Sequence, residues 1–353
     1  MRRVFGAAIA ALLTLGALGP ASAQQQSDVT LRVASAGGPF TEAVRRNVAD
    51  RFTRKTGIKV QFIDGNNPDH LAKIIASKGR TPPYDVAITD KATQDSAIAN
   101  GLLLKLDPEL VPHLSELVDG VRHKEGYGPQ FLLVDRGIVY NAEKFKEAGI
   151  PEPTSWLDLW NPKLAGKISI PDIAQANGPG FLIQINRVVG GNETDLEKGI
   201  RKIAELKVHS YYSSTVQVEA LLPTGELWAA NMPNGRAWAL IDKGLPLKFV
   251  VPKEGSVGNP TTIDVVGGTK YPREAQLFVD AALSPLAQLG LSYDVPYGPT
   301  NKLLEPILAA DPDHSRKFPW TQDQLAKIHA PDWASYVARQ NETLDLWNRL
   351  IRR

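Results

Sequence analysis

The pattern of apolar and polar positions predicts strands and helices that follow one another in turn. Apolar residues occupy alternate positions over residues 29–34, which is the period of a half-buried strand, and they alternate again over 58–62. Between these segments lies a predicted amphipathic helix, which ends at Gly57 and carries an apolar residue at every fourth position: Phe40, Val44, Val48 and Phe52. Parallel strands joined by a helix need a right-handed crossover. The turn before the helix therefore lies at the carboxyl edge of a sheet, where open α/β folds bind ligands.

The same alternation continues and brings polar residues to three consecutive strand ends. A helix is predicted over 70–77 and a buried strand over 84–89. Residues 35–38, 64–66 and 89–91 then end three strands at one edge of a parallel sheet. Ordinary turn chemistry explains any one of these turns, whereas three that converge favour a ligand site. A second set of strands begins within 128–141, with polar ends at Asp172 and at 231–236.

The first residues of the chain predict an export signal. Arg2 and Arg3 precede an apolar run over 4–18 and small residues up to Ala23, a pattern typical of a signal peptide cleaved after Ala23. The run is shorter than the roughly 20 residues that span a bilayer. Residues 1–23 are therefore excluded from the fold, and the mature protein is predicted to be free in the periplasm. The two arginines suit an ordinary charged region or a twin-arginine signal.

Composition excludes several classes of protein. Cysteine is absent, so the chain has no disulfide, no thiolate metal site and no lipid-attachment cysteine. The 40 basic residues nearly balance the 38 acidic ones, and no basic run suggests a nucleic acid partner. About 330 residues remain after cleavage, which suits two domains. We expect a monomer without a cofactor or a bound metal.

Several stretches together resemble one family, the bacterial solute-binding proteins that serve ABC importers, in the branch that includes spermidine/putrescine-binding proteins. The resemblance covers almost the whole mature chain, and it depends on the order and spacing of the stretches more than on any one of them. They are Gly37 and Gly38 with the following helix, 56–60, 137–141, 155–160, 166–168 and 251–255.

The resemblance implies an α/β fold with two lobes, the type II periplasmic-binding-protein fold, in which each lobe is a mostly parallel sheet flanked by helices. Two crossing hinge segments, near residues 134–135 and 257–262, join the lobes, which close over one small-molecule solute. Lobe 1 is expected to comprise residues 28–134 and about 262–305, and lobe 2 residues 135–261 and about 306–353. The family implies delivery of the solute to an ABC transporter permease in the inner membrane, and a chemosensory receptor is a further partner to consider.

The residues of a polyamine site are only partly present. Polyamine binders resemble one another in acidic residues and tryptophans that hold ammonium groups. Asp172 matches one such acid, but Gln175 stands where a second is expected. Residues 259–261 replace an expected Trp and Asp, and Arg236 follows the turn that would contribute Trp-Asn-Gly. A ferric site would need adjacent tyrosines on that turn, but the tyrosine pair of this chain is at 211–212.

The remaining polar residues predict a site for a small polar or zwitterionic organic solute, with a polyamine and a ferric ion as alternatives. Backbone N–H groups at the glycine turn suit an anionic group, and an arginine in the cleft would bind a carboxylate through two hydrogen bonds. The candidate ligand-binding residues are Ser35, Gly37, Gly38, Asn66, Asp90, Asp172, Tyr211, Asn234, Gly235, Arg236, Thr262 and Tyr297.

An exported enzyme is the competing class of function. The Gly-x-Ser-x-Gly, His-Glu-x-x-His and P-loop motifs are absent, and none of the six histidines lies near another at ligand spacing. Gly37 and Gly38 also lack the spacing of a dinucleotide-binding turn. We therefore predict no catalytic residues.

Overall fold

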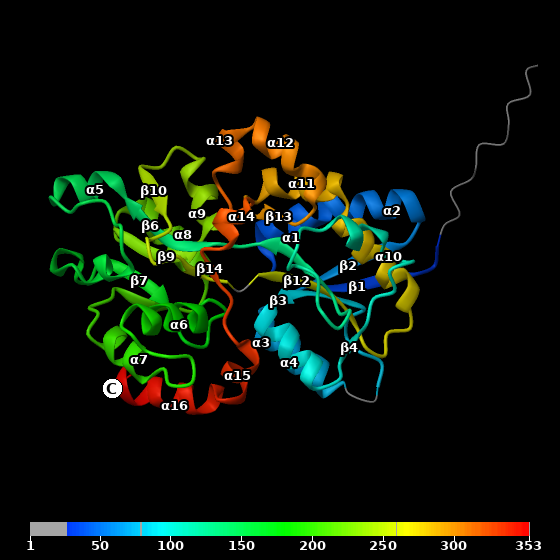
Figure 1. The fold of residues 1–353 in the computed structure, drawn as a ribbon, viewed down its shortest axis with the longest axis horizontal. Coiled ribbons are helices and arrows are strands. Elements are labelled where there is room, and N and C mark those ends of the chain that lie inside the picture. Colours follow the sequence, from blue (N-terminus) through cyan, green and yellow to red (C-terminus); the bar gives the residue numbers. More distant parts are fainter. Residues whose placement is uncertain (1–26, 78–79, 259, 353) are drawn as a thin grey trace, which may run out of the picture.

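The computed structural model describes residues 27–77, 80–258 and 260–352, and it contains two lobes, each built on a β-sheet (Figure 1). The predicted signal peptide lies outside these residues. In lobe 1 the strand order is β13-β5-β12-β3-β1-β2, and β4 pairs with β12. The strands are β1 Thr30–Ser35, β2 Lys59–Asp64, β3 Val86–Asp90, β4 Leu103–Leu104, β5 Gln130–Leu133, β12 Thr261–Val266 and β13 Gly298–Pro299.

Lobe 2 contains a five-stranded sheet with the order β10-β6-β9-β7-β8. Helices cover both faces of this sheet, as they do in lobe 1. The strands are β6 Arg136–Asn141, β7 Ile168–Pro171, β8 Ser210–Tyr212, β9 Ala229–Pro233 and β10 Leu247–Val250.

Both sheets are mixed, which corrects the prediction of mostly parallel sheets. Strand β1 is parallel to β2 and β3, and β7 is parallel to β8 and β9. Strand β12 is antiparallel to β3 and β5, and β6 is antiparallel to β9. The reason is the chain path. Strands β12 and β6 begin at the crossings between the lobes, so they run away from the edge at which β3 and β9 end.

Helices from distant parts of the chain cover the sheet of lobe 1. The core on one face takes side chains from α1 Gly38–Val44, α10 Pro272–Leu283 and α11 Pro285–Asp294. The core on the other face takes them from α3 Asn67–Ala76 and α4 Lys91–Ala99. In lobe 2 the corresponding helices are α5 Ala142–Glu147, α6 Gly178–Val188 and α7 Glu197–Ala204 on one face, and α8 Thr215–Thr224 and α9 Asn234–Ile241 on the other.

The first predicted helix forms as one helical run that contains a wide turn. Helix α1 continues through a π-helical turn over Arg45–Ala49 into α2 Asp50–Thr56, and Gly57 ends the run with a left-handed φ of 76°. The four apolar residues that predicted the helix are all buried. Their four-residue spacing drifts from the 3.6-residue α-helical period, and the wider π turn offsets that drift.

The two predicted crossings are confirmed, and the structure adds a third connection. Residues 134–135 join β5 to β6, and the second crossing runs from β11 Ser256–Val257 into β12. The C-terminal segment then passes between the lobes in Figure 1, where β14 Ile328–His329 pairs with β11. It ends on lobe 2 with α15 Trp333–Ala338 and α16 Gln340–Leu350.

The helices α12 Glu305–Ala310 and α13 Pro312–Ser315 lie against lobe 1, which differs from the division predicted at residue 306. His314 hydrogen-bonds Ser292 of α11 through Nε2 and Oγ at 3.0 Å, and the Tyr293 hydroxyl donates to Asp311 at 2.8 Å. These contacts hold the two helices against α11. The sequence did not predict them, because the partners in α11 are distant from α13 along the chain.

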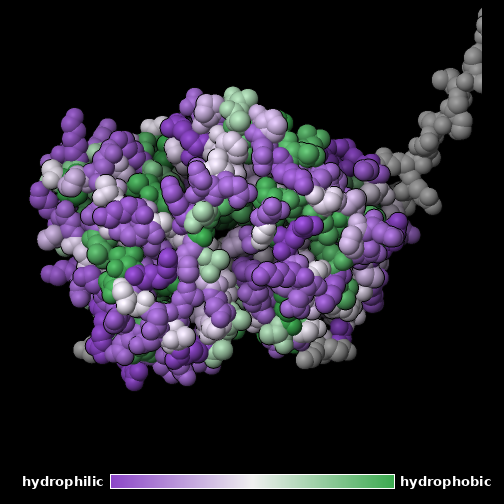
Figure 2. All heavy atoms as spheres, in the orientation of Figure 1, coloured by the Kyte–Doolittle hydropathy of each residue, from purple (hydrophilic) through white to green (hydrophobic). Residues whose placement is uncertain are grey.

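The face of the molecule seen in Figure 2 is mostly hydrophilic, with apolar side chains in scattered patches. Within the described ranges, no helix combines the length and the apolar character needed to cross a membrane.

Candidate ligand-binding site

A cavity of about 630 Å³ lies between the two lobes. Both predicted edges contribute to it, because β1 and β3 of lobe 1 and β7 and β9 of lobe 2 end at this cavity. The lining from lobe 1 and the crossings is 36–40, 65–68, 88–90, Val134, Thr261 and Tyr297. The lining from lobe 2 is Arg136, 174–177, 213–216, Glu219, Pro233 and Arg236.

The glycine turn after β1 forms one part of the lobe 1 wall. Gly37 and Gly38 have φ values of 82° and 60°, which residues with a Cβ atom rarely adopt. Thr41 holds the turn, because its Oγ1 accepts a hydrogen bond from the Gly37 N–H at 2.9 Å and lies 2.7 Å from Ser35 Oγ. A Cβ on Gly38 would meet no atom within 4 Å, so this residue borders open space.

Asp90 supplies the acidic group of the lobe 1 wall. It caps α4, since Oδ1 accepts from the Thr93 N–H at 2.8 Å, while Oδ2 accepts from Asn67 Nδ2 at 2.7 Å. Its neighbour on the wall, Asn66, caps α3 in the same way through the Asp69 N–H at 2.9 Å. Both caps use the polar strand ends that the sequence predicted, and Asp90 keeps a carboxylate beside the cavity.

Arg136 supplies a buried cation at the base of the cavity, and the sequence prediction missed it. Its Nε and Nη2 donate to Asn177 Oδ1 at 3.1 and 2.9 Å, and Nη1 donates to the Val257 carbonyl at 3.4 Å. Burial lowers the pKa of Arg136, although a guanidinium stays protonated in proteins. The sequence does contain a hint of this site, because two charged residues, Asp135 and Arg136, interrupt an otherwise apolar run over 131–140.

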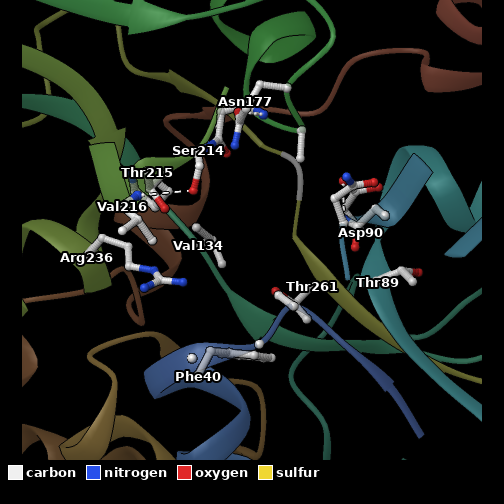
Figure 3. A pocket seen from close by; sticks show the side chains of 18 of the residues that line it. Phe40, Thr89, Asp90, Val134, Asn177, Ser214, Thr215, Val216, Arg236 and Thr261 are labelled. Atoms are coloured by element: carbon white, nitrogen blue, oxygen red, sulfur yellow. Dashed lines mark hydrogen bonds between the residues drawn. The ribbon is translucent and has the colours of Figure 1, made fainter. Parts of the chain in front are cut away.

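A second cation enters the cavity from α9 together with an acidic partner. Arg236 Nη1 lies 3.2 Å from Glu219 Oε1, and both side chains are largely buried. Glu219, on α8, was not among the predicted site residues. Figure 3 shows Arg236 and Asp90 on opposite sides of the cavity, with Phe40 and Thr261 between them on lobe 1. The charged lining residues are thus two arginines and two carboxylates.

Tyr297 and Phe40 form the aromatic part of the lining. Their ring centroids lie 6.2 Å apart at an interplanar angle of 53°. Burial raises the pKa of the Tyr297 hydroxyl, while the two cavity arginines act in the opposite direction. Gly235 makes room for this ring, because a Cβ at that position would lie 2.5 Å from Tyr297 Cε1.

Comparison with known proteins identifies the family of this chain. Residues 47–315 match the model of the bacterial extracellular solute-binding protein family. The chain belongs to the bacterial extracellular solute-binding proteins. This solute-binding protein is 25% identical over 292 residues to the spermidine/putrescine-binding periplasmic protein of Escherichia coli K12, an alignment that covers 77% of this chain and 80% of the relative.

Two further comparisons involve proteins named for γ-aminobutyric acid. The γ-aminobutyric acid-binding protein of Pseudomonas aeruginosa is 24% identical over 303 residues, 82% of each chain. The solved structure of the Atu4243 GABA receptor superposes with a TM-score of 0.75 and 22% identity, and the match covers 90% of this chain and 96% of the other. The structural match bears on the fold alone.

Six of the twelve predicted residues of this solute-binding protein line the cavity: Gly37, Gly38, Asn66, Asp90, Arg236 and Tyr297. The other six lie outside the lining. Ser35 is buried beneath the glycine turn, and Gly235 supports Tyr297. Thr262 points to the opposite face of β12 from Thr261, because successive side chains of a strand alternate.

The remaining three residues make structural contacts. Asn234 accepts from the Asp135 N–H at 3.0 Å and donates to the carbonyls of Pro296 and Lys317 at 2.6 and 2.8 Å. Asp172 forms an ion pair with Arg352 at 2.6 Å. Tyr211 packs against Trp347 with ring centroids 5.7 Å apart. Each of these partners lies far away in the sequence, so the pattern around a strand end could not reveal them.

No group of three or more His, Asp or Glu side chains suited to a metal ion occurs among the described residues. The cavity lining includes one tyrosine, Tyr297, and its raised pKa disfavours the phenolate that a ferric ion prefers.

Replacing Gly38 with valine is expected to weaken solute binding at least about tenfold, because the side chain would enter the open space beside the cavity. The positive φ adds a folding cost of about 1–2 kcal/mol. Gly101→Val is the matched control, since Gly101 also has a positive φ of 66° and no atom within 4 Å, but lies outside the cavity lining. Calorimetric titration of both variants would measure the difference, and equal affinities would contradict the expectation.

Proposed function

We propose that this protein captures a small zwitterionic organic solute in the cavity between its lobes and delivers it to an ABC transporter permease. Hinge closure buries the solute, and the solute shifts the equilibrium because it binds the closed form more tightly. The mature protein acts as a monomer in the periplasm after cleavage behind Ala23. The relatives support this location, because the Escherichia coli protein is named as periplasmic.

Arg136 is the observation that carries the proposal. Within the part of the chain that the structure describes, Arg136 makes three hydrogen bonds. A guanidinium has five N–H donors, so two remain for a solute carboxylate. Planar guanidinium groups bind carboxylates through paired, charge-assisted hydrogen bonds. A solute with a carboxylate therefore fits this end of the cavity.

The two acidic residues of the lining supply the complementary half of the site. Asp90 and Glu219 already accept hydrogen bonds, but carboxylate oxygens accept more than one. An ammonium group beside them balances the charge of the cavity. A polyamine carries positive charges only, and it would bring them against two arginines.

The relatives support an amine-containing solute. One relative is named for γ-aminobutyric acid, which is a zwitterion, and another for spermidine and putrescine. The balanced charges of the cavity favour the zwitterion. A polyamine is the second candidate, and the name of the Escherichia coli relative supports it. A chemosensory receptor is proposed as a further partner of the loaded protein, beside the permease.

The midpoint temperature of thermal unfolding, Tm, of residues 24–353 is expected to rise more with γ-aminobutyrate and other amino acids than with spermidine, putrescine or glutarate. A ligand at 100 times its Kd adds about 2.7 kcal/mol, which is several degrees for a chain of this size. Glutarate controls for the carboxylate alone and putrescine for the amine alone. A larger shift with spermidine or putrescine would overturn the proposed solute. Mass spectrometry of solute released from protein purified without refolding would then identify the compound.

A further inference from the structure

The C-terminal segment lies beyond the residues that match the family model, yet it contacts both lobes. It pairs with the second crossing through β14, and Trp333 Nε1 donates to the Gly258 carbonyl at 3.2 Å. Helix α15 packs against α4 of lobe 1, and α16 packs against α7 of lobe 2. Figure 1 shows this segment running between the lobes and ending along the edge of lobe 2.

The end of the segment is fastened to lobe 2 at two points. Trp347 of α16 is buried and packs edge-on against Tyr211 of β8. Five residues later, Arg352 Nη2 lies 2.6 Å from Asp172 Oδ2, and the Asp172 side chain is only 10% exposed. The Arg352 side chain is 53% exposed, so the pair acts by fixing the orientation of Asp172 more than by adding stability.

Asp172 begins the loop that forms part of the lobe 2 wall. Its Oδ1 accepts from the Ala174 N–H at 3.0 Å, and its carbonyl accepts from the Gln175 N–H at 2.9 Å. Gly178 closes the loop tightly, because a Cβ there would lie 2.1 Å from the Asp172 carbonyl oxygen. Of the five residues between Asp172 and Gly178, all but Ile173 line the cavity: 174–177.

The loop in turn positions Arg136. Gln175 Oε1 accepts from the Asn177 N–H at 2.6 Å, and Asn177 Oδ1 accepts the two hydrogen bonds from Arg136. Contacts thus run without a gap from the C-terminal Arg352 through Asp172 and the loop to the cation of the cavity.

We propose that Arg352 is a positioning residue for solute binding: its ion pair with Asp172 holds the 172–178 loop in the shape that sets Asn177 against Arg136. The proposal rests on the proposed function, since it assumes that this cavity binds the solute. It also accounts for Asp172. Asp172 matches an acidic position of the polyamine-binding proteins in sequence, but here it supports the wall from outside the cavity instead of lining it.

The decisive experiment is hydrogen exchange of the ligand-free protein, followed by mass spectrometry of peptides that cover 172–178. Arg352→Ala is expected to speed exchange there roughly three- to tenfold. Asp172 accepts hydrogen bonds from the Ala174 and Gln175 N–H groups, and without Arg352 its side chain is no longer held in place. Asp172→Asn keeps an acceptor for the Ala174 N–H but removes the charge, so it should have the same effect. The double variant should add little to either. Arg352→Lys should restore part of the protection.

Arg201→Ala is the matched control, because Arg201 forms an exposed ion pair with Glu197 of the same helix, α7. It should leave exchange over 172–178 unchanged. Unaltered exchange in Arg352→Ala, or a rise spread evenly over lobe 2, would overturn the positioning role.

Solute affinity provides the second measurement, with γ-aminobutyrate as the probe. Arg352→Ala is expected to raise its Kd roughly three- to tenfold, and Arg201→Ala should not change it. If the wild-type protein fails to bind γ-aminobutyrate and other zwitterions, the proposed solute is wrong, while the exchange result still decides the positioning role. If the wild-type protein binds γ-aminobutyrate but Arg352→Ala leaves exchange over 172–178 unchanged, the positioning role fails and the proposed function stands.

Discussion

Replacing Arg136 with alanine is expected to weaken solute binding by roughly a hundredfold or more. Loss of one partner of a buried, hydrogen-bonded charge pair costs about 2–5 kcal/mol, and each 1.4 kcal/mol is a factor of ten. The side chain also serves the hinge, because it reaches from the first crossing to the Val257 carbonyl in the second. Ser256 Oγ of the second crossing donates to Asp135, so residues 135–136 tie the two crossings together.

Arg136→Lys separates the charge from the shape of the group. Lysine keeps the positive charge but has no planar fork, so it should recover only part of the affinity. Arg273→Ala, an exposed arginine on α10, is the control for loss of a positive charge elsewhere. Calorimetric titration gives the affinities, and a thermal scan checks folding. If Arg136→Ala bound the solute as tightly as wild type, Arg136 would not be its anchor.

Replacing Asp264 with asparagine is expected to stabilise the protein near neutral pH. Asp264 is buried in lobe 1, where its Oδ1 accepts from Gln94 Nε2 at 2.8 Å and from the Gly128 N–H at 3.0 Å. Burial raises the pKa of this carboxyl from 3.8 to about 6, despite these hydrogen bonds. Its Oδ2 is buried, and the effect of the nearby Thr262 hydroxyl, which lowers the pKa, is smaller than the effect of burial. An asparagine amide at this position adds a donor and removes the charge.

The sign of the pH dependence follows from the raised pKa. A carboxyl whose pKa is higher in the folded state binds its proton more tightly there, which favours folding while it is protonated. That contribution is complete below about pH 3.8 and is lost as the pH rises through about 6. Wild type therefore loses stability over this range relative to a variant that is neutral at every pH.

Urea unfolding at about pH 4.5 and about pH 7.5 would measure the effect. The stability of Asp264→Asn minus that of wild type should be larger by about 2 kcal/mol at the higher pH, given the two pKa values. Subtracting the two proteins at the same pH cancels the other titrating groups that they share. A difference that is the same at both pH values would show that Asp264 is ionised in the folded protein at both.

Local sequence predicted some of the packing contacts of this chain but not others. The serine and the two tryptophans of the 155–160 stretch have the local pattern of a capped helix that packs on a core. The stretch forms a 3₁₀ helix with a capping box at Ser155, and Trp156 is buried with its Nε1–H donated to the Gly255 carbonyl. By contrast, Asn234 reads as a polar turn residue at a strand end, but its amide holds the segments around Pro296 and Lys317. Only the folded chain brings those carbonyls to it.

The local periodicity of apolar residues predicted the alternation of strands and helices, because it reports the face that each element buries. The two lobes and their crossings were implied by the resemblance to the solute-binding family. The tertiary structure decided which polar residues face the cavity, because that depends on pairing between distant segments. Arg136 acquires its place from Asn177 and Val257, and Asp172 turns to Arg352, 180 residues away. A residue's own neighbours in sequence carry no record of such partners, so they appear only when the sheets and the C-terminal segment are assembled.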